Sequence, residues 1–151
     1  MPNAPETNLS PEQSRALRRI AGIMIPASET YAVPGADDPA IIEDIIRSLG
    51  RDAGSVRDAL GLLDAHSGGA FADLDQAQAA TVAESFLAGG GAEVTALGRA
   101  VLQCYYRDDR VVRSLGLEPR PPFPKGHVLE QGDWSLLDAV RGRPKMWRDA
   151  P

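Results

Sequence analysis

Apolar residues recur every three or four positions along the first two-thirds of the chain, a spacing that places them on one face of an α-helix. The first such segment follows Ser10-Pro11, which supplies an N-cap serine and a proline at the first helical position. The second follows Asp38-Pro39, which repeats this start signal. Their apolar positions are Ala16, Leu17, Ile20, Ala21 and Met24, then Ile41, Ile42, Ile45, Ile46 and Leu49. Two helices are therefore predicted, the first ended by Pro26 and the second by Gly50.

The same periodicity predicts four more helices, over residues 53–65, from residue 74 to the glycines at 89–91, over 92–107 and over 110–115. Their inward positions are Val56, Leu60 and Leu63, then Ala79, Val82, Ala83, Phe86 and Leu87, then Val94, Leu97, Val101, Leu102 and Tyr105. No segment alternates apolar and polar residues for long enough to predict a strand. The predicted class is all-α, a compact bundle of five or six short helices.

The helical pattern stops near Gly116, and the remaining residues are rich in proline and aromatic side chains. Six of the twelve prolines and both tryptophans lie between residues 119 and 151. Proline opposes regular structure, whereas large aromatic side chains need a surface to pack on. We therefore predict a flexible N-terminus over 1–9, a helical bundle over 10–116 and an extended arm over 117–151. The arm packs on this bundle, on a partner, or on both.

Charge narrows the choice of partner. The formal net charge is −5, with 10 basic and 17 acidic residues over 1–118 but 6 basic and 4 acidic residues over 119–151. An acidic chain is a poor partner for nucleic acid or an anionic membrane, and no run of residues is apolar and long enough for a membrane span. No signal peptide is visible, so the expected location is cytoplasmic, or periplasmic if the chain is exported with a partner or a signal has been removed.

The residues that could carry chemistry do not form a recognisable site. Cys104 lies inside an apolar helical pattern, which predicts a buried, inert thiol. His66 and His127 have no neighbouring ligand at a metal-binding spacing, and no nucleophile stands beside an oriented base. The acidic pairs at 37–38 and 108–109 stand where helix caps are expected. We therefore expect no catalytic, cofactor-binding or metal-binding residue in this chain.

The candidates for function are instead partner contacts at the end of the fifth helix and in the arm. Aromatic residues presented on irregular backbone are typical interface anchors, and nearby basic residues orient a partner. The predicted interface residues are Tyr106, Arg107, Pro121, Phe123, Pro124, Lys125, Trp134 and Leu137. Packing of the aromatic residues on this chain's own helices is the alternative interpretation.

Three stretches of the sequence resemble one known family. They are Ile25-Pro26-Ala27 followed by Pro34-Gly35-Ala36-Asp37, then Tyr105-Tyr106 with Asp108 and Leu115-Gly116, then Pro121-Pro122-Phe123-Pro124-Lys125-Gly126 leading into Gly132-Asp133-Trp134-Ser135-Leu136-Leu137. Together they resemble the gluconate 2-dehydrogenase subunit 3 family. Those proteins are the small subunits of FAD-dependent dehydrogenases of the glucose-methanol-choline (GMC) oxidoreductase type. The resemblance spans roughly residues 16–148.

The resemblance implies a non-catalytic subunit. In that family a large subunit carries FAD and oxidises a sugar, sugar acid or other alcohol, and the small subunit supports its stability, maturation or export. A cytochrome c subunit is a further partner in some members, but no Cys-x-x-Cys-His haem motif occurs here. The alternatives left open are a stand-alone helical protein that binds a small ligand and a small helical enzyme.

Overall fold

The structure, a computed structural model, describes residues 9–121, 126 and 128–147. These residues form α-helices and short 3₁₀-helices, with one isolated β-bridge and no strand. The α-helices are α1 (Pro11–Met24), α2 (Pro39–Ser48), α3 (Ala53–Ser67), α4 (Gln76–Gly89), α5 (Ala92–Tyr105), α6 (Asp109–Ser114) and α7 (Asp138–Arg141). The 3₁₀-helices are η1 (Gly50–Asp52), η2 (Phe71–Asp73) and η3 (Trp134–Leu137). The all-α class predicted from the sequence is confirmed.

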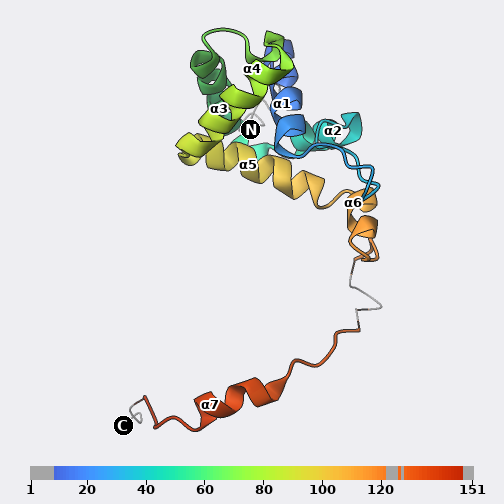
Figure 1. Ribbon diagram of the computed structural model, residues 1–151, viewed down its shortest axis with the longest axis vertical. Helices are drawn as coiled ribbons and strands as arrows, with labels where there is room; N and C mark the ends of the chain where they lie inside the picture. Colours follow the sequence, from blue (N-terminus) through green and yellow to red (C-terminus); the bar gives the residue numbers. More distant parts are fainter. Residues whose placement is uncertain (1–8, 122–125, 127, 148–151) are drawn as a thin grey trace, which may run out of the picture. The chain divides into compact units, whose positions relative to one another are not determined.

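The chain divides into two compact units, Met1–Pro119 and Arg120–Pro151. The first unit, called the bundle from here on, contains α1 to α6 and both η1 and η2 (Figure 1). The second unit, called the arm, contains η3 and α7. The arm therefore begins three residues later than residue 117, the start that the sequence pattern predicts.

Side-chain caps determine where several helices begin. Ser10 accepts a hydrogen bond from the backbone N–H of Gln13, whose side chain in turn accepts one from the N–H of Ser10, completing a capping box. Asp75 forms the same kind of box at the start of α4. Asp38 and Asp108 cap α2 and α6, as their positions in the sequence predicted.

The central helix of the bundle is α3, which packs against α1, α4 and α5, while α2 packs against α5. The core is aliphatic apart from a few rings. Its largest fully buried side chains are Phe71, Leu17, Ile20, Ile41, Ile45, Leu60, Leu63, Leu97, Val56, Val101 and Val111. Every buried apolar residue of the described chain belongs to the bundle, so burial in the arm contributes nothing to this core.

A short connection between α1 and α2 ties distant parts of the bundle together. Ser28 and Val33 form an antiparallel bridge, and the N–H of Ala36 donates to the carbonyl of Ile25 at 2.8 Å. The hydroxyl of Tyr105, at the end of α5, donates to the carbonyl of Pro34 at 3.2 Å. The first two stretches that carry the family resemblance therefore contact each other.

Two sequence predictions need correction. Leu102 was expected to face inward, but its side chain is 44% exposed. The buried face of α5 follows Leu97, Val101, Cys104 and Tyr105, and Leu102 lies about 100° around the helix from Val101. The arm was expected to be irregular, yet Trp134–Arg141 is helical, as 3₁₀ and then α.

Some helix ends differ by one or two residues from the bounds predicted from the sequence. The third helix continues to Ser67, the fifth ends at Tyr105 rather than near Arg107, and the sixth covers Asp109–Ser114. Among the described residues, no helix is both long and apolar enough to cross a membrane.

Candidate partner-binding surface

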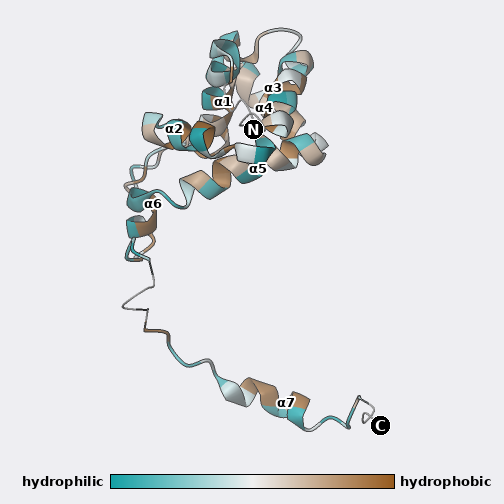
Figure 2. Ribbon diagram, turned by 180° about the vertical axis from the view of Figure 1, so that it is seen from behind, coloured by the Kyte–Doolittle hydropathy of each residue, from teal (hydrophilic) through white to brown (hydrophobic). Residues whose placement is uncertain are grey.

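The arm exposes several large apolar side chains. Asp133 begins η3 by accepting a hydrogen bond from the N–H of Ser135, and Gly142 follows the last residue of α7. The exposed apolar residues on and after this helical stretch are Trp134, Leu136, Leu137, Val140, Met146 and Trp147, with exposed fractions from 40% to 84%. Figure 2 shows brown, apolar positions beside teal, hydrophilic ones along the helical stretch Trp134–Arg141. We call these six residues the arm patch.

Four residues of the arm patch border a hollow of about 500 Å³. They are Leu137, Val140, Met146 and Trp147, and the wall also includes two basic residues, Arg141 at the end of α7 and Arg143 after it. The ammonium of Lys145 lies 5.6 Å from the ring centre of Trp147, a cation–π contact. The indole N–H of Trp134 donates to the side chain of Gln131 at 3.1 Å. Both indoles are thus partly oriented while Trp134 stays 61% exposed and Trp147 70% exposed.

A second apolar surface lies at the end of α5 in the bundle. Leu102 and Tyr106 are four residues apart and therefore neighbours on the helix surface, and they are 44% and 55% exposed. The ring of Tyr106 meets that of the buried Tyr105 edge to face, with 5.3 Å between the ring centres. Tyr105 is 4% exposed, so the predicted division between an inward and an outward tyrosine is confirmed.

Arg107 is held by the bundle beside this surface. Its Nε donates to Asp44 Oδ2 at 2.6 Å, and its Nη2 donates to the hydroxyl of Ser48. Partial burial raises the pKa of Asp44, but the hydrogen bonds from Arg107 and Arg47 outweigh burial and hold that pKa below its usual value. The hydrogen bond to Asp44 raises the pKa of Arg107. The predicted orienting charge is therefore already matched by an internal carboxylate.

The predicted interface residues fall into three groups. Tyr106 and Arg107 lie at the end of α5 in the bundle. Pro121, Trp134 and Leu137 are exposed in the arm. Phe123, Pro124 and Lys125 lie outside the described residues. The structure adds Leu102 in the bundle and Leu136, Val140, Met146 and Trp147 in the arm. The apolar spacing of Trp134, Leu137 and Val140, three residues apart each time, was the sequence signal for helix that the proline content obscured.

The ion pair of Arg107 also borders the single cysteine. Cys104 is 3% exposed, which confirms the predicted buried thiol, and burial raises its pKa. A thiol with a raised pKa is a poor nucleophile at neutral pH. Among the described residues, no three His, Cys, Asp or Glu side chains gather as metal ligands would.

A second network joins α2 to α6. The Nη groups of Arg110 donate to both carboxylate oxygens of Asp38 at 3.0 Å each, and Arg110 also binds Asp108 at 2.9 Å. These hydrogen bonds lower the pKa of Asp38 and of Asp108, and raise that of Arg110. Each aspartate is also a helix cap, so Arg110 joins the starts of two helices.

The described residues form an all-α bundle followed by a C-terminal unit that exposes an apolar patch. Comparison of the chain with protein-family models, curated proteins and solved structures gave no match. The inference to function therefore rests on the exposed surfaces and on the family resemblance of the sequence.

Proposed function

We propose that this chain is a non-catalytic small subunit that binds a large FAD-dependent dehydrogenase of the GMC type. The observation that carries the proposal is the arm patch, six large apolar side chains exposed on one short segment. FAD belongs to the partner, and this chain supplies no cofactor ligand. In some complexes of this type a cytochrome c subunit is a third member.

Leaving the arm patch in water has a free-energy cost. Exposed apolar surface gains free energy when a partner covers it, at about 25 cal/mol per Å². Indole rings supply much of this area, and tryptophan is among the residues that dominate binding energy at interfaces. Helical spacing of Trp134, Leu137 and Val140 suits an apolar groove on the partner, the arrangement used by many short helical ligands.

The surface at the end of α5 offers a second point of attachment. Tyr106 is restrained by its edge-to-face contact with Tyr105, and the neighbouring Arg107 is fixed by Asp44. Restrained side chains lose less conformational entropy when a partner binds. In this proposal Tyr106 and Leu102 contact the flavoprotein, while Arg107 holds the end of α5 in place.

Binding alone is enough to explain how such a subunit acts. A partner that binds only the folded flavoprotein stabilises it by RT ln(1 + [L]/Kd), about 2.7 kcal/mol at a hundredfold excess over Kd. No catalytic group in this chain is needed for that effect. Turnover of substrate by the purified chain alone would contradict the proposal.

The test is co-expression with a large FAD-dependent dehydrogenase of the GMC type. We expect the tagged flavoprotein to retain this chain, and we expect the Trp134→Ala and Leu137→Ala variants each to weaken the complex by about tenfold or more. The matched control is Leu62→Ala, because Leu62 is a half-exposed leucine on α3, outside both surfaces. Equal retention of the wild-type chain and the arm variants would refute the role of the arm patch.

A further inference from the structure

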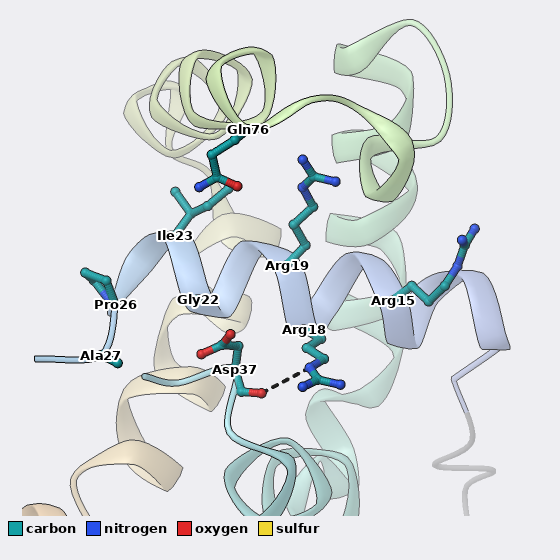
Figure 3. A pocket seen from close by; sticks show the side chains of 9 residues that line it. All are labelled: Arg15, Arg18, Arg19, Gly22, Ile23, Pro26, Ala27, Asp37 and Gln76. Carbon is teal, nitrogen blue, oxygen red and sulfur yellow. Dashed lines mark hydrogen bonds between the residues drawn. The ribbon is translucent and has the colours of Figure 1, made fainter. Parts of the chain in front are cut away.

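A groove on the outer side of α1 carries an unbalanced positive charge within an acidic bundle. The groove has a volume of about 420 Å³ and follows the helix stripe that includes Arg15, Arg18, Arg19 and Gly22. Figure 3 shows Arg18 and Asp37 on one side of α1, with Arg19 and Gln76 on the other. Neither the sequence motifs nor the proposed partner surface involves these arginines.

The hydrogen-bond partners of Arg18 and Arg19 set them apart from most other arginines of the bundle. Six arginines are each paired with at least one carboxylate: Arg15, Arg47, Arg99, Arg107, Arg110 and Arg113. Arg18 instead donates from Nε to the backbone carbonyl of Asp37 at 3.1 Å. Arg19 donates to the carbonyls of Ala72, at 2.6 Å, and Leu74. Carbonyl dipoles orient a guanidinium but do not neutralise its charge.

In both arginines, some N–H donors have no hydrogen-bond acceptor among the described residues. The Nε–H of Arg18 is its only donor with a hydrogen-bond acceptor among the described residues, so both Nη groups are open to the solvent side of the groove. The Nε of Arg19 is buried and has no hydrogen-bond partner among the described residues. A fixed, solvent-facing pair of Nη groups matches the two oxygens of a carboxylate or phosphate.

Asp37 is the one acidic group that lines the groove. Its side chain packs against Gly22 and Gly35, because a Cβ on Gly22 would lie 3.0 Å from the Asp37 Cβ and a Cβ on Gly35 would overlap Oδ1. The two glycines therefore set the position of this carboxylate, which is not within ion-pair distance of a described basic side chain. Asp37 offsets part of the positive charge and so lowers the affinity for an anion without abolishing it.

We propose that this groove binds an anionic oxygen group, a carboxylate or a phosphate, through the Nη groups of Arg18, with the charge of Arg19 adding attraction. A free small anion and an acidic side chain of another polypeptide present the same chemistry. The groove is open to solvent, so either source can reach it. This inference does not depend on the proposed flavoprotein partner, because it concerns residues outside both apolar surfaces.

The test is titration of the full-length chain with inorganic phosphate, with acetate and with a triglutamate peptide, followed by NMR of the arginine Nε–H groups. Chloride holds the ionic strength constant, so that general screening does not change during the titration. We expect a saturable shift of the Arg18 resonance. Stronger binding of triglutamate than of acetate would identify a polypeptide as the source, and similar binding would identify a free anion.

Two variants with opposite expected effects keep the test independent of stability. Arg18→Met should weaken binding by about tenfold, because a charge-assisted hydrogen bond is lost. Asp37→Asn should strengthen it by about threefold, because a neighbouring negative charge is removed. Arg51→Met is the matched control, since Arg51 is an exposed arginine outside the groove. Absence of a saturable shift, or equal affinity of the wild type and both groove variants, would overturn the proposal.

Discussion

Single residues in this bundle act mainly by joining helix ends, and Arg110 is the clearest example. It binds the cap residues of both α2 and α6, and its own side chain is 45% exposed. Exposure to solvent reduces the free-energy contribution of an ion pair. The bidentate contact of Arg110 with Asp38 and the partial burial of the aspartates increase it. The expected net contribution of the network is therefore modest.

We predict that Arg110→Met lowers the free energy of unfolding by about 1 kcal/mol at neutral pH. The matched control is Arg113→Met, which removes an exposed pair with Asp109 within α6 and should cost less than about 0.5 kcal/mol. Urea unfolding followed by circular dichroism measures both values. Equal losses in the two variants would mean that the link to α2 contributes nothing.

The same network predicts a dependence on pH. The pKa values of Asp38 and Asp108 are lowered from 3.8 in the folded chain, so their ion pairs contribute stability above that value. This contribution is lost as the pH falls through the lowered pKa values, because protonated aspartate no longer attracts Arg110. The difference in unfolding free energy between wild type and Arg110→Met should therefore shrink as the pH falls from about 5 to about 2. A constant difference over this range would contradict the assignment.

The capping roles of Ser10, Asp38 and Asp108 could be predicted from the sequence, because a cap depends on neighbours within a few residues. The bridge by Arg110 could not, since Arg110 and Asp38 are 72 positions apart. That Arg18 has no carboxylate partner among the described residues could not be predicted from the sequence either. It depends on which acceptors the folded chain brings to each arginine.

At the scale of elements, α3 is central to the bundle, because it packs against α1, α4 and α5. Leu60 and Leu62 lie on the same helix, but Leu60 is 0% exposed and Leu62 is 51% exposed. We predict that Leu60→Ala lowers the free energy of unfolding by about 2–5 kcal/mol, through lost burial and a residual cavity. Leu62→Ala should change it by less than about 0.5 kcal/mol. Chemical unfolding of both variants tests the orientation of α3, and similar losses would show it to be wrong.

The periodic segments predicted the bundle helices well, since each has an apolar stripe and start signals nearby. The helical turn of the arm was missed for a physical reason. Trp134–Arg141 is short, and its neighbours include Gly132, Gly142 and Pro144, which favour irregular backbone. Its start depends on two local hydrogen bonds, from the N–H and the hydroxyl of Ser135 to the carboxylate of Asp133, rather than on burial.

At the scale of the whole molecule, the core and the arm patch lie in different units. All buried apolar residues of the described chain precede Pro119, the last of them being Val111. We predict that a chain ending at Pro119 keeps the melting temperature of the full-length protein within about 2 °C, because no core contact is removed. Circular dichroism during heating measures this, and a lower melting temperature would mean that the arm stabilises the bundle.

The same shortened chain separates folding from binding. If it folds but no longer accompanies the flavoprotein, the arm patch is required for the complex. If it folds and still binds, the surface of Leu102 and Tyr106 is sufficient. Neither result follows from the sequence pattern alone, because exposure of an apolar side chain is a property of the folded chain.

The separation of the two units has an optical consequence. Both tryptophans of the protein, Trp134 and Trp147, belong to the arm. The fluorescent aromatic residues of the bundle are all tyrosine or phenylalanine. Fluorescence excited at a wavelength that only indole absorbs therefore comes from the arm and not from the bundle. A blue shift of this emission would signal that the indoles have left water, and it would do so in the native protein without any added dye.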